Sequence, residues 1–227
     1  MMYECKNMNF RLAKSERKTM SIYVERDGSL TVRAPKDITD HKLGEILDRK
    51  RHWIRKAIAE LEELNRTRVL RQFVNGEGFL YLGKSYRLRI ERGAGKPLSL
   101  SRGYFVLDES HVSKAKDRFI DYYKESGKKY IPARVEYFRK KLGVNPEGVR
   151  VMELRNRWAS RGRSGLNFHW KLMLAPQSII DYIIVHELAH FIQADHSSRF
   201  WEYVESVMPN YREKKNWLRM NGAYLDI

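Results

Sequence analysis

The sequence predicts an α+β fold, with a β-rich N-terminal region and a helical C-terminal region that contains a short sheet. Up to about residue 109, short apolar stretches alternate with glycine-containing turns. From Ser110 onward, apolar residues recur at the 3.6-residue spacing of helices. Hydrophobic residues make up 42% of the 227-residue chain, which is enough to build a folded core. We therefore expect two regions, 1–109 and 110–227, packed separately or as one continuous unit.

The N-terminal region is expected to contain several strands and one long helix. Residues 20–24 and 30–34 alternate in hydropathy on either side of a turn and predict a hairpin. Apolar positions at helical spacing predict a helix over 41–65. Four further strands are expected to form a small antiparallel sheet, at 79–82, 86–90, 98–101 and 104–107.

The C-terminal region is expected to contain helices and two strands. The spacing predicts helical structure from Val112 that breaks near Gly127 and ends at Gly143. Strands are expected at 149–154 and 166–174, on either side of an arginine-rich loop. The remaining helices are expected over 177–194, 198–207 and 211–220.

Composition limits the class of protein. One cysteine, Cys5, excludes a disulfide framework and a cysteine-based zinc finger. No apolar run approaches the roughly 20 residues that a membrane-spanning helix needs, and the first residues lack the apolar stretch of a secretory signal. We expect a soluble cytoplasmic protein that does not bind membranes, and the sequence carries no signal for its oligomeric state.

The chain is strongly basic, with 44 Lys and Arg residues against 28 Asp and Glu, a net charge of +16. Such a charge suits nucleic acid, another anionic surface or simple solubility. No motif of a known nucleic-acid-binding fold accompanies it. The densest cluster, a candidate anionic contact in a stretch with glycine and serine, is Arg155, Arg157, Arg161 and Arg163.

The strongest chemical signal is the motif His-Glu-Leu-Ala-His at 186–190, within an apolar stretch. Residues four apart on a helix differ by about 40° around the axis and about 6 Å along it, so His186 and His190 can share one metal ion. Glu187 would lie beside that ion, where it can take a proton from an activated water. This spacing is typical of zinc peptidases and predicts Zn²⁺ as cofactor with Glu187 as general base.

A third metal ligand is expected, because catalytic zinc commonly has three protein ligands and one open position. His196, six residues after His190, can return to the metal if the helix ends near residue 194. Glu202 and Glu205 on the following helix are the alternatives. The same two glutamates and Asp195 are candidates to accept the N–H of a ligand imidazole.

Two classes of function follow from these residues. The first is a zinc metallopeptidase that acts on a protein or peptide, with the strand over 166–170 pairing with an extended substrate. His169 on that strand is a candidate for substrate or oxyanion contact, or an ordinary strand side chain. The alternative is a nucleic-acid-associated protein whose metal helix is structural, or a protease recruited to DNA.

Several segments also follow a known family pattern: 156–160, 166–168, 172–176, 181–190 and 196–201, with weaker matches upstream. Together they resemble the YgjP-like metallopeptidases, which are related to the SprT-like and WLM proteins, over nearly the whole chain. The resemblance implies a zincin-like (gluzincin-type) metal-dependent hydrolase. It also implies that His186, His190 and His196 are the metal ligands and that Glu187 is the catalytic base. The chain departs from the family pattern at Ala159 and Arg161, where the family usually has Gly and Cys.

Overall fold

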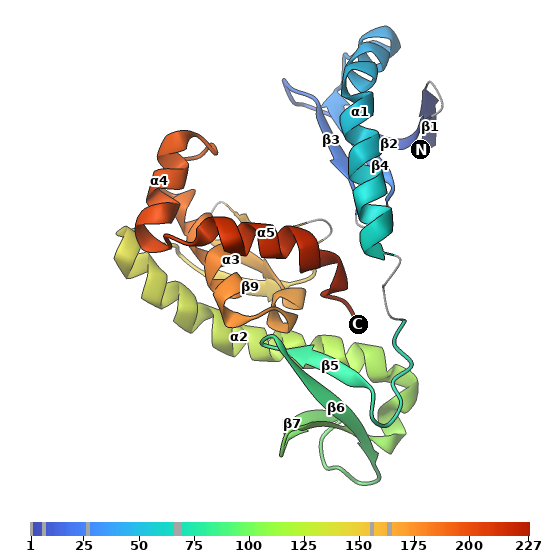
Figure 1. Cartoon of the computed structure of the whole chain (residues 1–227), viewed down its shortest axis with the longest axis vertical. Coiled ribbons are helices and arrows are strands. Elements are labelled where there is room, and N and C mark those ends of the chain that lie inside the picture. The colour runs from blue at the N-terminus through green and yellow to red at the C-terminus, as the bar shows by residue number, and fades with distance from the viewer. Residues whose placement is uncertain (1, 6–7, 26–27, 66–69, 155–156, 163–164) are drawn as a thin grey trace. The chain divides into compact units, whose positions relative to one another are not determined.

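The structure is a computed structural model that describes residues 2–5, 8–25, 28–65, 70–154, 157–162 and 165–227 (Figure 1). The chain divides into two compact units, Met1–Arg68 and Val69–Ile227. Helices and small mixed sheets within the described residues confirm the predicted α+β class. The boundary expected after residue 109 falls inside the second unit, because the strands before it share a core with the C-terminal helices.

The first unit is a four-stranded sheet with one helix, α1 (Asp40–Asn65). The predicted hairpin and helix are both present. Strands at the start of the chain were not expected, although Phe10 and Leu12 alternate with polar residues there. The sheet order is β1-β2-β4-β3, from β1 (Met2–Cys5), β2 (Met8–Ser15), β3 (Ser21–Val24) and β4 (Leu30–Pro35).

The core of the first unit lies between this sheet and α1. Its cluster of buried apolar residues is small and consists, among the described residues, of Phe10, Leu30, Val32, Leu43, Leu47 and Ile54. The inner strands β2 and β4 are parallel, and each outer strand is antiparallel to its neighbour.

The second unit begins with a four-stranded sheet of the same kind. Its order is β5-β6-β8-β7, from β5 (Gly78–Tyr81), β6 (Lys84–Glu91), β7 (Leu98–Ser101) and β8 (Tyr104–Asp108). The expected antiparallel arrangement holds for the two hairpins but is wrong at the centre, where β6 and β8 are parallel. The two hairpins join through their inner strands, which brings buried Leu88 of β6 beside Phe105 of β8.

A short 3₁₀ helix, η1 (Glu109–Lys114), leads into the long helix α2 (Ala115–Leu142). The expected break at Gly127 is wrong, because α2 continues through it. A Cβ at this position would lie 2.9 Å from a methyl group of Val151, so glycine lets the neighbouring strand approach the helix. Gly143 ends α2 as predicted, with a left-handed φ of 66°.

A three-stranded sheet in the order β10-β11-β9 packs against α2 through β9. Its strands are β9 (Val149–Met152), β10 (Ala159–Arg161) and β11 (Leu166–His169). β10 occupies part of the expected arginine-rich loop. β11 is shorter than expected, because Trp170–Leu174 form a 3₁₀ helix, η2.

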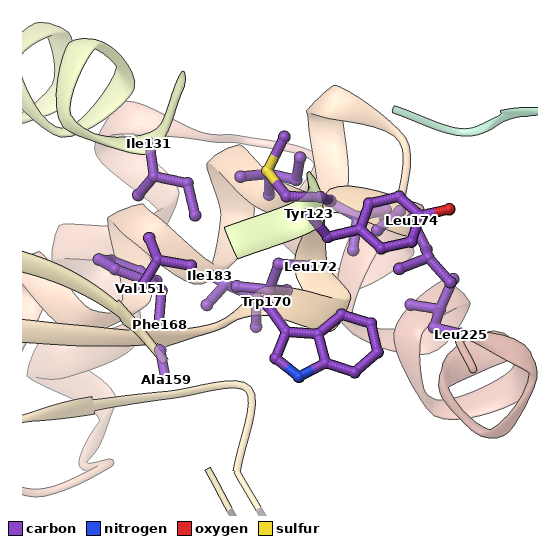
Figure 2. Packing of buried hydrophobic residues seen from close by; sticks show 14 of the residues in the cluster. Tyr123, Ile131, Val151, Ala159, Phe168, Trp170, Leu172, Leu174, Ile183 and Leu225 are labelled. Carbon is purple, nitrogen blue, oxygen red and sulfur yellow. The ribbon is translucent and has the colours of Figure 1, made fainter. Parts of the chain in front are cut away.

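The apolar helix α3 (Gln177–Ala189) lies at the centre of the second unit and packs against α2, α4 (Ser198–Val207) and α5 (Tyr211–Asn221). A last 3₁₀ helix, η3 (Gly222–Tyr224), follows α5. Figure 2 shows Ile183 of α3 in the same cluster as Ile131 of α2 and Phe168 of β11. A helix buried on all sides is expected to be apolar all round.

Two further contacts fix α3. The guanidinium of Arg134 on α2 donates two hydrogen bonds of 2.8 Å to the buried carboxylate of Asp181. The β5–β6 turn abuts the start of α3, where a Cβ on Gly83 would lie 2.8 Å from the Cα of Pro176. In the described part of the chain, no helix combines the length and apolar character needed to cross a membrane.

Candidate metal centre

Three imidazoles converge where α3 ends. His186 lies in the last turn of α3, His190 is the residue that caps it, and His196 follows in the loop before α4. One ring nitrogen from each lies within 4.8 Å of the others. The Nε2 atoms of His186 and His196 are 3.1 Å apart. Zinc–nitrogen bonds of about 2.0–2.1 Å in tetrahedral geometry place two ligand nitrogens about 3.3 Å apart, so these residues fit one metal ion.

Two of the three histidines, His186 and His196, have lowered pKa values that favour the neutral imidazole. Burial, with the nearby charges of His190, His196 and Lys215, lowers the pKa of His186 to about 3. Burial is also the main cause that lowers the pKa of His196, with further effects from His190 and Lys215. A neutral imidazole has a free lone pair, so these two can bind a metal without first losing a proton.

Hydrogen bonds in the loop after α3 orient His190. Its Nδ1 lies 3.2 Å from the carbonyl oxygen of Gln193, which leaves Nε2 for the site. The side chain of Gln193 donates to Asp195, and the same carboxylate oxygen accepts the backbone N–H of Ser197. This local network makes the turn without a glycine. Arg161 adds a hydrogen bond from its guanidinium to the backbone carbonyl of His190.

His186 is held by packing. Its Nδ1 is buried and, within the described part of the chain, has no hydrogen-bond partner. The ring of Phe200, fully buried on α4, lies 4.6–5.0 Å from all three imidazoles. Trp201 stacks on His196 with ring centres 5.9 Å apart. The orientation of His186 is therefore fixed by contacts with the Phe200 and Trp201 rings, and the structure shows no carboxylate bonded to its imidazole among the described residues.

The carboxylates expected around the metal lie elsewhere. Glu202 is exposed, and Glu205 lies 3.9 Å from the guanidinium of Arg212. Neither belongs to the cluster of described residues that could hold an ion. Asp195 caps the loop through its bonds to Gln193 and Ser197 and accepts from no imidazole in a bond that the structure shows.

Glu187 lies on the buried helix next to the first histidine, with 9% of its surface exposed. Burial raises its pKa to about 7, and the charge of Arg157 and a hydrogen bond from the backbone N–H of Arg161 offset part of this rise. Glu187 and His186 line a cavity of about 430 Å³. Its other lining residues are Trp158, Ala159, Tyr182, Ile183, Lys215, Leu218 and Arg219.

His169 has a local structural role. It is 1% exposed, its Nδ1 accepts the backbone N–H of Lys171, and its Nε2 lies 3.2 Å from the carboxylate of Glu153. The indole N–H of Trp170 donates to the same carboxylate. These contacts fix the junction of β11 and η2.

The predicted arginine cluster is only partly described, because Arg155 and Arg163 lie outside the described residues. Arg157 is exposed and acts on Glu187 through its charge, while Arg161 bonds to His190 and lies over the Phe191 ring. The described members therefore lie close to Glu187 and His190.

Sequence reasoning missed several residues around the histidines. Phe200 and Trp201 lie in the 196–201 segment that follows the family pattern, but no local signal placed their rings against the histidines. Lys215 and Arg219 are four residues apart on α5, which indicates a shared helix face. Their spacing does not say what that face borders.

A cluster of three imidazoles beside a buried carboxylate is typical of metal-dependent hydrolases. The chain belongs to the YgjP-like family, because the YgjP-like metallopeptidase domain matches residues 18–221. The resemblance noted from the sequence is thereby confirmed.

Comparison with solved structures found the crystal structure of the metallopeptidase zymogen of Pyrococcus abyssi abylysin. The two chains are 27% identical over 38% of this chain and 89% of that chain, with a TM-score of 0.36. No curated protein matches the chain.

Proposed function

We propose that the protein is a zinc-dependent metallopeptidase in which His186, His190 and His196 bind the metal and Glu187 is the general base. The convergence of three imidazole nitrogens within 4.8 Å beside a buried glutamate is the observation that carries this proposal. Three imidazole ligands suit zinc well. A zinc ion held there supplies Lewis acidity that polarises a peptide carbonyl and makes water more acidic.

Glu187 provides the proton transfer that peptide hydrolysis needs. It borders the same cavity as His186, so it can accept a proton from the attacking water and deliver it to the leaving amine. Burial strengthens its basicity, because it raises the pKa toward neutrality.

An extended substrate would pair with β10. The structure corrects the expectation for residues 166–170, because β11 is paired on both sides. Hydrogen bonds join β10 and β11 at Trp158 with His169 and at Gly162 with Gly165. In an antiparallel ladder the residues between such pairs direct their N–H and C=O groups outward. Ala159 therefore offers its backbone groups to a substrate strand, and it also lines the cavity beside Glu187.

The substitution Glu187→Gln tests the mechanism. We expect about one zinc per chain, by mass spectrometry of the metal, and a fall in kcat of roughly a hundredfold to ten-thousandfold on a peptide mixture. The matched control is Glu202→Gln, an exposed glutamate outside the metal cluster, which should keep both properties. Undiminished turnover by Glu187→Gln would rule out Glu187 as the base.

Contact with DNA stays a prediction. Binding that weakens steeply with salt, and falls when Arg155, Arg157, Arg161 and Arg163 are all changed to Ala, would support it. The same variant needs a zinc measurement, because Arg161 also bonds to His190.

A further inference from the structure

The cavity that contains Glu187 combines apolar walls with a cationic rim. Trp158, Ile183 and Leu218 form apolar parts of its wall. Lys215 and Arg219 line it from α5, where their four-residue spacing places them on one helix face. A substrate side chain in this cavity therefore meets hydrocarbon and positive charge together.

The charges of the rim are available to a ligand. Both side chains are exposed, and in the described part of the chain no carboxylate forms an ion pair with either. Arg219 donates to the neutral amide of Asn216, and the Lys215 ammonium lies 4.2 Å from the ring centre of Trp201. Neither contact neutralises a charge.

The rim also lies close to the reacting groups. Lys215 and Arg219 line the same cavity as His186 and Glu187. Among the lining residues, Glu187 is the one carboxylic acid, and its assigned role is that of the base. Electrostatic complementarity would therefore favour an anionic ligand group near the scissile bond.

We propose that this cavity selects peptides that carry a carboxylate close to the scissile bond. The inference rests on the peptidase function proposed above and names its substrate class. The carboxylate is either an Asp or Glu side chain or the free C-terminus of the peptide, because the same cationic rim recognises both. The apolar walls bind the hydrocarbon part of the same or the adjacent residue.

The test starts with a cleavage profile of a mixed peptide library by the full-length wild type. A well-cleaved peptide is then made with Asp or with Asn next to the scissile bond, each with a free or an amidated C-terminus. Binding of the labelled peptides to zinc-loaded Glu187→Gln protein is followed by fluorescence anisotropy, which does not depend on turnover. An exposed ion pair contributes roughly twofold to fivefold in affinity, so two cations predict about a fourfold to twenty-five-fold preference for the carboxylate.

To test the rim, Lys215→Gln and Arg219→Gln are both introduced into the Glu187→Gln protein. The preference for carboxylate-bearing peptides should then fall to about twofold or less. Lys214→Gln is the matched control: Lys214 is adjacent on α5, forms an ion pair with Glu213 at 3.8 Å and does not line the cavity. The zinc content of each variant shows that the metal centre is intact.

Equal binding of all four peptides would overturn the inference, as would a preference for a carboxylate that survives the loss of both rim charges. A preference that follows the free C-terminus supports it and identifies the terminal carboxylate as the ligand. If library peptides are cleaved with no preference for a carboxylate, this inference is overturned and the proposed peptidase function still stands. Zinc-loaded wild type that neither binds nor cleaves any library peptide would overturn the proposed function as well.

Discussion

The two four-stranded sheets of the chain share one topology and differ in what they support. Each consists of two hairpins joined through parallel inner strands, and each is followed by a long helix. The first sheet and α1 enclose a small core of their own. The second sheet and α2 share a larger core with the helices and the three-stranded sheet around the histidines.

One turn of the second four-stranded sheet contacts the start of α3. Gly28, between β3 and β4, has a φ of 80°, and a Cβ there would meet nothing within 4 Å. Gly83, between β5 and β6, has nearly the same φ but abuts Pro176 at the start of α3. The backbone N–H of Leu82 beside it donates to Met173. Gly83 therefore docks against the start of α3, whereas Gly28 has open space at its Cβ position.

The largest expected effect is the loss of zinc when a histidine of the second unit is replaced, compared with a histidine of the first unit. The substitution His186→Ala should weaken zinc binding by roughly a hundredfold or more, because it removes one of the three proposed ligands. His52→Ala, an exposed histidine on α1, should leave the zinc content at about one per chain. Mass spectrometry of the metal measures both, and zinc retained by His186→Ala would remove His186 from the site.

Core truncations should show whether the units unfold separately. Phe79→Ala and Phe10→Ala each remove a buried ring, at a cost of about 3–5 kcal/mol. Zinc stabilises only the unit that binds it. In calorimetry with and without zinc, Phe79→Ala should lower the transition that zinc raises, and Phe10→Ala should lower the other. One transition that moves in both variants would show that the units unfold together.

The docked turn gives a smaller effect. Gly103, between β7 and β8, has a φ of 82° with nothing near its Cβ position, so Gly103→Ala should cost about 1 kcal/mol of backbone strain. Gly83→Ala adds a clash with Pro176 and should cost about 2–4 kcal/mol. Denaturant unfolding compares the two directly, and equal costs would contradict the docking of the β5–β6 turn.

The smallest effect concerns Arg161, whose guanidinium bonds to the carbonyl of His190. Arg161→Ala should weaken zinc binding roughly threefold to tenfold, and Arg161→Lys should recover part of the loss. Arg150→Ala, an exposed arginine on β9 of the same sheet, is the control. Competition with a zinc chelator measures these differences, and an unchanged affinity in Arg161→Ala would leave the bond without a role at the metal.

Local patterns predicted most helices, because a helix repeats its signal every turn. They also predicted that His186 and His190 face the same way, since four-residue spacing fixes this within one helix. His196 was within reach because only five residues separate it from His190. Its place in the cluster nevertheless depends on the turn around Gln193.

Features that depend on distant contacts were not predictable from local patterns. Glycine is unfavourable in a helix interior. At Gly127 the helix nevertheless continues, because the close approach of Val151 leaves no room for a larger residue. Strand alternation does not tell which hairpins join side by side, so the parallel pair of β6 and β8 was missed. Arg161 fits the pattern of a charged loop, and only its pairing with Leu166 places it in a strand.

The outer edge of β10 has a consequence for self-association. An open strand edge that can accept a substrate segment can equally accept a strand of another copy, which begins aggregation. β10 is three residues long, ends at the exposed Arg161 and is followed by Gly162. Shortness and a terminal charge both discourage edge-to-edge stacking of folded chains. The proposed pairing at Ala159 is thus compatible with an edge that resists growth into a continuous intermolecular sheet.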